Sequence, residues 1–367
     1  QDSLLLTHLQ KLKNHKMNKN IYRVLFNVVL LLITYLFYIF PFETLNKLLL
    51  NQTQSFQYSL INTLIFYILI LYYLRSHSTF KPLKIFVYEG LGIGFISFII
   101  VSICVVFNYI LQISTLFLGI SSLILIILIY LYGSYNARTI NIKEIDIKSS
   151  RINKNYQILF ISDVHLGTNN KKHLIKIIKN IKKLNFDFLL IGGDLIDSSS
   201  FDLKDLDILK EINKPIYFVS GNHEYYLKDY QNKINQLKTF NINHLKNTKI
   251  EIDGINLIGI DDNQTESSKI HFANKLCNNN LFNLLVCHKP DIWQKLDCNN
   301  YLMLSGHTHN GQIFPFNFIV KLKFRFIHGL YNNNESNLYV SSGVACWGPK
   351  IRLGSKNEII HIKLVKV

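Results

Sequence analysis

Long uninterrupted runs of hydrophobic residues occupy the first third of the chain. They cover residues 21–40, 56–74, 85–111 and 115–133, and almost no charged residue interrupts them. Each run is close to the roughly 20 residues that a helix needs to cross a bilayer. The pattern predicts four transmembrane helices rather than buried helices of a soluble protein. Because only a few residues separate the third and fourth runs, a re-entrant arrangement there is an alternative.

The distribution of Lys and Arg predicts how these helices are oriented. Basic residues lie before and at the start of the first run and between the second and third runs, whereas the first loop has only Lys47. Basic loops stay on the cytoplasmic side. Residues 1–20 are therefore expected to form a basic cytosolic segment. They lack the apolar core of a signal peptide, so the first run is expected to be an anchor in the inner (cytoplasmic) membrane. Four crossings place the C-terminal domain in the cytosol.

The pattern changes after a linker and first-strand region at residues 134–156. Over residues 157–367, short apolar runs alternate with polar helices, which is typical of an α/β domain. Strands are expected at residues 157–161, 186–191, 216–219, 257–260, 284–286, 301–304 and 338–340. A helix is expected from about Lys171, with Leu174, Ile177, Ile178 and Ile181 on its apolar face. Its lysine-rich face is expected to be solvated, with contact to anionic head groups as the alternative.

Polar residues suited to metal binding follow five of these strands. The motifs are Asp163-Val-His165, Gly193-Asp194-Leu-Ile-Asp197, Gly221-Asn222-His223-Glu224, His288 and Gly306-His307-Thr-His309. Strand ends of an open α/β sheet meet at one edge, where such folds place their sites. Carboxylate, amide and imidazole ligands together suit Mn²⁺, Fe or Zn²⁺ better than Ca²⁺. Taken singly, each motif is explained as well by a turn or a helix cap.

The order of these five motifs resembles the five signature blocks of the calcineurin-like metallophosphoesterase superfamily, over about residues 158–367. The resemblance extends to a subgroup of bacterial transmembrane metallophosphoesterases, which includes phosphodiesterases and relatives that hydrolyse UDP-2,3-diacylglucosamine. It rests on residues 161–167 (ISDVHLG), 221–226 (GNHEYY), 306–312 (GHTHNGQ) and 341–352 (SSGVACWGPKIR). It implies a helical membrane region followed by a two-sheet β-sandwich flanked by helices. Asn310 stands where the family usually has Gly, and Asn tolerates the left-handed backbone that such a loop needs.

The resemblance also implies a set of metal ligands. One divalent ion would be held by Asp163, His165 and His309, and a second by Asn222, His288 and His307, with Asp194 bridging both. Mn²⁺ is the favoured metal, with Fe or Zn²⁺ as alternatives. Such a metal pair can activate water for in-line attack on phosphorus.

Three further residues have expected roles outside the ligand set. His223 would be the general acid, and Asp197 would orient it by accepting a ring N–H hydrogen bond. Arg352 is a candidate for binding a substrate phosphate. Glu224 is expected to support the site rather than to bind a metal.

Composition and charge agree with a membrane-bound phosphoesterase. Hydrophobic residues make up 49% of the chain, and the formal net charge is +16, which suits a membrane surface or a phosphorylated substrate. No RNA- or DNA-binding module is apparent, so no nucleic-acid partner is expected. The five cysteines contain no CxxC pair and no spacing typical of a disulfide framework, which indicates a reducing compartment.

The sequence therefore predicts a membrane-anchored phosphoesterase with a dinuclear metal site. The expected reaction is hydrolysis of a phosphodiester or pyrophosphate bond. Anchoring beside the bilayer favours a lipid-linked nucleotide, such as a UDP-diacylglucosamine-type glycolipid. The alternatives are a broad-specificity phosphodiesterase or phosphatase acting on soluble substrates, and a non-catalytic membrane scaffold. A complete ligand set argues against the scaffold, and spans without paired ionisable groups argue against a transporter.

Overall fold

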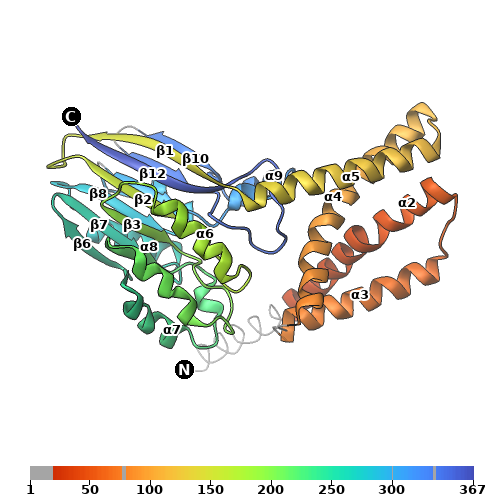
Figure 1. The fold of residues 1–367 in the computed structure, drawn as a ribbon, viewed down its shortest axis with the longest axis horizontal. Coiled ribbons are helices and arrows are strands. Elements are labelled where there is room, and N and C mark those ends of the chain that lie inside the picture. The colour runs from red at the N-terminus through yellow and green to blue at the C-terminus, as the bar shows by residue number, and fades with distance from the viewer. Residues whose placement is uncertain (1–19, 77–79, 300, 334–335) are drawn as a thin grey trace, which may run out of the picture. The chain divides into compact units, whose positions relative to one another are not determined.

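The computed structural model describes residues 20–76, 80–299, 301–333 and 336–367. It divides into two units, Gln1–Leu131 and Tyr132–Val367 (Figure 1). The predicted basic segment lies almost wholly outside the described residues.

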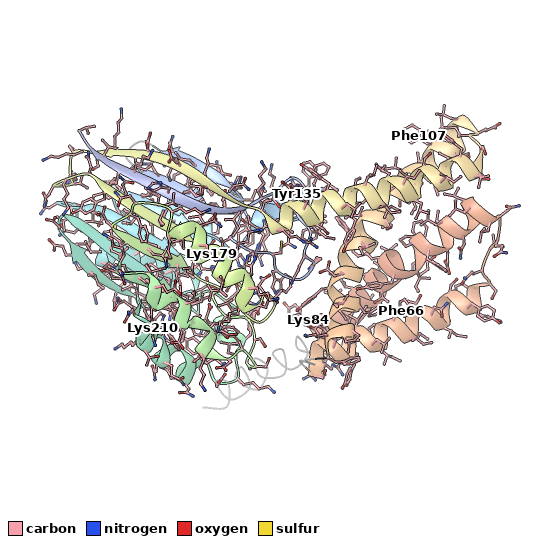
Figure 2. All side chains as sticks on the ribbon, in the orientation of Figure 1. Phe66, Lys84, Phe107, Tyr135, Lys179 and Lys210 are labelled. Atoms are coloured by element: carbon pink, nitrogen blue, oxygen red, sulfur yellow. A yellow bond between two sulfur atoms is a disulfide. The ribbon has the colours of Figure 1, made fainter. Side chains whose placement is uncertain are left out.

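Four helices in the described part of the chain are long and apolar enough to cross a membrane. They are Asn20–Leu50, which contains a π-helical segment η1 (Tyr35–Ile39) followed by α2 (Phe40–Leu50), and α3 (Phe56–Ser76), α4 (Lys81–Leu111) and α5 (Thr115–Arg138). Many of their large apolar side chains are exposed, including Phe107 (Figure 2), as expected of surfaces that face lipid.

The first helix is longer than the predicted run at residues 21–40. Pro41 falls in the first turn of α2, where a missing backbone N–H costs little, so the helix continues through it. The π-helical segment packs closely against α4, because a Cβ at Gly94 would lie 2.0 Å from the carbonyl oxygen of Phe37. The hydroxyl of Tyr38 donates to the carbonyl oxygen of Val87 at 2.7 Å. Small residues allow such close approach between membrane helices.

The second unit contains two six-stranded mixed sheets. The first has the order β1-β12-β2-β3-β4-β5, with β1 Ile140–Ser149, β12 Asn357–Lys366, β2 Tyr156–Ile161, β3 Phe188–Gly192, β4 Ile216–Val219 and β5 Ile242–His244. The second has the order β10-β11-β9-β8-β7-β6, with β10 Gly329–Asn333, β11 Ser336–Val340, β9 Tyr301–Ser305, β8 Phe282–Cys287, β7 Ile255–Ile260 and β6 Thr248–Ile252.

Helices cover the outer faces of both sheets. They are α6 (Lys171–Ile181), α7 (Tyr230–Gln236) and α8 (Glu266–Leu276), with the 3-10 turns η2 (Leu203–Glu211), η4 (Leu237–Phe240) and η5 (Pro290–Lys295). The unit also contains the 3-10 turns η3 (Glu224–Tyr226) and η6 (His309–Gly311) and the helix α9 (Phe316–Lys323), none of whose residues is buried. The predicted apolar face of α6 is buried on the first sheet. Its lysine face is exposed, as Lys179 shows (Figure 2). A separate core fills the space between the two sheets.

The expected two-sheet sandwich is confirmed, and each of the seven expected strands is present. Four strands beyond the first-strand region were missed, namely β5, β6, β10 and β12. β12 is fully inside the first sheet, between β1 and β2. Its sequence mixes Glu, His and Lys with Ile and Leu, and the polar residues obscure the apolar run on which strand prediction depends.

A disulfide joins Cys277 and Cys298, whose Cα atoms lie 6.1 Å apart. The cysteine spacing, which is not typical of a disulfide framework, did not predict this bond. Asn274, in the last turn of α8, forms two hydrogen bonds with Asp297. The backbone N–H of Asp297 donates to Asn274 Oδ1 at 3.0 Å, and Asn274 Nδ2 donates to Asp297 Oδ2 at 3.3 Å. These contacts bring together two cysteines that are 21 residues apart, and the spacing alone does not reveal them.

Phe160 tests the core between the sheets, where it is fully buried. Replacing it by Ala leaves a cavity, so Phe160→Ala should lower the free energy of unfolding by about 3–5 kcal/mol, or the melting temperature by roughly 10 °C. Ile142→Ala, on the exposed side of β1, should change the melting temperature little. Both tryptophans, Trp293 and Trp347, lie in the second unit, so their fluorescence reports its melting. Equal melting of the two variants would contradict this packing.

Candidate metal centre

Five strands deliver the predicted ligands to one edge of the second unit. Asp163 and His165 follow β2, Asp194 follows β3, Asn222 follows β4, His288 follows β8, and His307 and His309 follow β9. Both sheets therefore contribute to the site. The parallel pairing of β2, β3 and β4, and that of β8 and β9, places these strand ends together.

The backbone at this edge is strained in a way that is common at functional sites. Five of the expected ligands have left-handed φ angles, namely Asp163 (56°), His165 (50°), Asp194 (53°), His307 (72°) and His309 (49°). This conformation is unfavourable for residues other than glycine, and it persists only where the surroundings enforce it. Asn310 has φ 51°, so this loop has the left-handed conformation expected of it with Asn in place of Gly.

The first group of ligands consists of Asp163, His165 and His309, whose potential ligand atoms all lie within 4.8 Å of one another. The Nε2 atoms of His165 and His309 face each other at 3.2 Å. His309 Nε2 also lies 3.5 Å from Asp163 Oδ1. Two ring nitrogens and a carboxylate aimed at a common point can hold a divalent ion.

The second group consists of Asp194, His288 and His307. His288 Nδ1 lies 2.8 Å from the carbonyl oxygen of Gly192, so Nδ1 carries the proton and donates it. With Nδ1 bound to that carbonyl, Nε2 is the nitrogen that faces the site, as is usual for a metal-binding histidine. His288 Nε2 lies 3.1 Å from Asp194 Oδ2 and 3.3 Å from His307 Nδ1.

Asn222 completes the expected set. Its side-chain oxygen is buried and accepts no hydrogen bond from the described residues. Such an atom usually has a partner, and a cation would supply one. It lies next to the site, because the backbone N–H of the following residue, His223, donates to Asp194 Oδ1 at 2.9 Å. Oxygen and unprotonated nitrogen donors in this mixture fit divalent transition-metal ions.

Asp194 dominates the electrostatics of the site. Burial alone would raise its pKa, but His288, His165 and His223 hold the pKa of this carboxyl well below its usual value. Conversely, burial would lower the pKa of His288, but Asp194 raises it to about 10. Burial, together with His288, lowers the pKa of His307 to about 3. The two groups therefore present an ionised carboxylate beside imidazoles of which one readily takes a positive charge.

Asp197 does not have the predicted contact with His223. Its Oδ2 lies 3.3 Å from His165 Nδ1, and its Oδ1 accepts a hydrogen bond from the backbone N–H of Thr168 at 2.8 Å. The carboxyl group therefore lies behind a metal-ligand candidate rather than beside the proposed acid. The carboxylate fixes the ring of His165 so that Nε2 points into the first group.

Arg352 is also placed differently from the prediction. Its side chain is fully buried, so it does not face a substrate. Its guanidinium donates to the carbonyl oxygens of Ala345 at 2.6 Å and His309 at 3.0 Å, and it lies 3.3 Å from His309 Nδ1. Burial, then His165 and Arg352, hold the pKa of His309 well below its usual value. Arg352 therefore holds His309 in place, and its charge adds to the effect of burial and of His165 on the pKa of this ring.

Glu224 ties two ligand loops together, as expected of a supporting residue. Its buried carboxylate accepts hydrogen bonds from the backbone N–H groups of Asp194, Ile196 and Gly221, at 2.8–3.1 Å. Gly221 lies against the ligands, since a Cβ there would be 2.2 Å from Asp194 Oδ1. Only glycine allows the loop after β4 to approach so closely.

His223 is one of the partly exposed histidines of the cluster. Its side chain is 17% exposed and that of His309 is 12% exposed, whereas those of His165 and His288 are not exposed. Its ring lies 5.5 Å from the rings of both Tyr226 and Trp347. Sequence reasoning noted these aromatic residues only as parts of motifs and gave them no role, because their contact with His223 depends on the meeting of two distant loops.

Comparison with known proteins identifies the family. Residues 156–330 match the calcineurin-like phosphoesterase family. A metallophosphoesterase of Campylobacter jejuni, named as uncharacterized, is 33% identical over 261 residues, which cover 66% of this chain and 68% of that protein. The chain belongs to the calcineurin-like phosphoesterases.

Two other relatives extend the comparison. A metallophosphoesterase of Helicobacter pylori is 35% identical, over 61% of this chain and 64% of that protein. A bovine protein named as a transmembrane protein with metallophosphoesterase domain is 34% identical, over 57% of this chain and 52% of that protein. The chain therefore spans between about half and two thirds of these relatives. As a calcineurin-like phosphoesterase it is a metal-dependent phosphoester hydrolase, and its apolar helices associate it with a membrane.

Asp197 offers a test of the support around His165. Asp197→Asn removes the carboxylate behind the ring, so affinity for the metal should fall by about 10- to 100-fold. Asp146→Asn, an exposed change on β1, removes the same charge far from these contacts and should leave affinity unchanged. Competition with a chelator measures both. Unchanged affinity in Asp197→Asn would show that Asp197 does not position His165.

Proposed function

We propose that this phosphoesterase hydrolyses a phosphodiester or pyrophosphate bond of a lipid-linked substrate, such as a UDP-diacylglucosamine-type glycolipid, with two divalent ions and preferably Mn²⁺. The observation that best supports a dinuclear site is the position of Asp194. Its Oδ2 lies 3.9 Å from His165 Nε2 and 3.1 Å from His288 Nε2. One carboxylate thus faces both ligand groups, as a bridging ligand must.

Two divalent ions would supply an activated water and would neutralise charge on the phosphoryl oxygens. Asp163, His165 and His309 would hold one ion, Asn222, His288 and His307 would hold the other, and Asp194 would touch both. His165 depends on Asp197 for its orientation, and His309 depends on Arg352. These supports keep the site in place before substrate arrives, which lowers the cost of reaching the transition state.

His223 is proposed as the general acid that gives a proton to the leaving oxygen. Its partial exposure allows contact with substrate, and its Nε2 lies 3.9 Å from Asp194 Oδ2. Burial lowers the pKa of His223 below its ordinary value of 6.5, so the protonated ring gives up its proton readily. Tyr226 and Trp347 flank the ring and would limit where a leaving group can lie.

Two alternatives concern the substrate and the activity. A broad-specificity phosphodiesterase or phosphatase would act on soluble substrates, and its membrane helices would serve only to localise it. A non-catalytic scaffold would not need a complete ligand set with matched supports. The four apolar helices support a substrate held in the membrane.

Metal dependence and the role of His223 can be tested together on detergent-purified protein. Stripped of metal and resupplied with Mn²⁺, it should hydrolyse bis(p-nitrophenyl) phosphate, and Asp194→Asn should abolish this activity. His223→Gln should lower kcat by about 10²- to 10⁴-fold for a phosphodiester with an alkyl alcohol leaving group. The loss should be smaller for p-nitrophenolate, which leaves without a proton. His271→Gln, an exposed change, is the matched control.

The pH dependence of the rate is a separate test of His223 as the general acid. An acid must be protonated to act, so the rate with an alkyl ester should fall as the pH rises through the pKa of His223, which lies below 6.5. That alkaline limb should be missing in His223→Gln. Equal losses for both leaving groups, with an unchanged pH profile, would contradict a general-acid role.

We propose that the catalytic unit lies in the cytosol. The basic residues Arg75, Lys81 and Lys84, at the end of α3 and the start of α4, support this orientation, whereas a disulfide such as Cys277–Cys298 is more typical of proteins outside the cytosol. Fusion of green fluorescent protein after Val367 should therefore fluoresce, and fusion of alkaline phosphatase there should be inactive. Fusions after Thr53, between the first two spans, should behave in the opposite way. An active alkaline phosphatase after Val367 would reverse the proposed orientation.

A further inference from the structure

We propose that α9 and the residue Phe314 before it form an interfacial helix that lies in the surface of an anionic bilayer, beside the metal centre. This inference rests on the proposed function, because it makes the lipid surface the place where the metal centre meets a lipid-linked substrate. The binding itself does not depend on catalysis and can be measured without it.

The apolar residues of this segment are exposed to an unusual degree. Phe314, Phe318 and Ile319 are 54–58% exposed, and Leu322 is 88% exposed. None of the eight residues of α9 is buried. Single exposed apolar residues are ordinary on a protein surface, but a cluster of them on one helix marks a place of interaction. A helix with this composition, in a chain that also has membrane-spanning helices, suits the boundary between head groups and acyl chains.

The charges of the segment fit an anionic surface. Lys321, Lys323 and Arg325 are all exposed, and the stretch from Phe314 to Ile327 contains no acidic residue. Basic residues near apolar ones are attracted to anionic lipid head groups. Water-soluble protein partners would not require this combination of large apolar side chains with unopposed positive charge. A bilayer is therefore the occupant that fits best.

Contacts within the second unit tie α9 to the end of the last membrane-spanning helix. The backbone N–H of Arg352 donates to the carbonyl oxygen of Gly133, in α5, at 3.0 Å. The next residue, Leu353, accepts a hydrogen bond from the backbone N–H of Phe314 at 2.9 Å. One short segment thus contacts both α5 and the start of α9, close to one another in Figure 1. Gly133 lies in the C-terminal part of α5, the last of the four candidate spans, so these contacts tie α9 to that part of the helix.

The same segment is tied to the metal centre. Arg352 donates to the carbonyl oxygen of His309, the first residue of η6, and four residues separate η6 from α9. Beyond α9, the ring of Phe324 lies 5.2 Å from that of His307. Ligand candidates therefore lie next to both ends of the helix. A lipid head group at the surface that α9 contacts would be within reach of the ligands.

Quenching of tryptophan fluorescence by brominated lipids tests the contact. Leu322→Trp in the full chain, reconstituted in vesicles of phosphatidylglycerol with brominated acyl chains, should lose roughly half of the added fluorescence. Val367→Trp is the matched control, since Val367 is also exposed and apolar but lies at the far end of β12, roughly 30 Å along the strand from Asn357. The unmodified chain supplies the background from Trp293 and Trp347.

The outcomes separate the bilayer from other occupants. Strong quenching of Leu322→Trp alone, weaker in zwitterionic phosphatidylcholine, would support the proposal. A blue-shifted emission without quenching would show that protein covers the helix, and emission typical of water would show that nothing does; either would overturn it. No turnover is needed, so a chain that hydrolyses no ester would refute the proposed function while leaving this result intact.

Discussion

A buried charge must be compensated where it lies, and the catalytic unit is organised around one such charge on Asp194. The carboxylate is almost fully buried, and one of its oxygens faces three imidazoles from three different loops. Leaving it unpaired inside the protein would cost several kcal/mol. Each loop that reaches it must therefore adopt a fixed path, and this explains why glycine and left-handed backbone concentrate there.

Most of the ligand set could be predicted from the sequence, because it depends on local chemistry at strand ends. Asp163, Asp194 and His288 each follow a short apolar run, and such runs are recognisable without a structure. The topology then brings the strand ends to one edge. The left-handed backbone at Asn310 was also predictable, since asparagine by itself tolerates that conformation better than most residues do.

The supporting contacts could not be predicted in the same way. Asp197 belongs to the same motif as Asp194, but only the path of its loop decides that it meets His165 rather than another imidazole. Arg352 belongs to a tail far from His309 in sequence, and its burial could not be inferred from its charge, since arginines are usually exposed. The disulfide was missed because the proximity of its two cysteines depends on how α8 packs.

The place of β12 in the first sheet has a consequence for how the protein is made. This strand follows the eleven other described strands in the sequence, yet it lies between β1, which follows the membrane-spanning helices, and β2. A ribosome releases it only after every other strand has been synthesised. Until then, β1 has no neighbour and β2 presents an open edge, which is a template for wrong pairing. Truncation before Asn357 would thus leave β1 unpaired and the edge of β2 exposed.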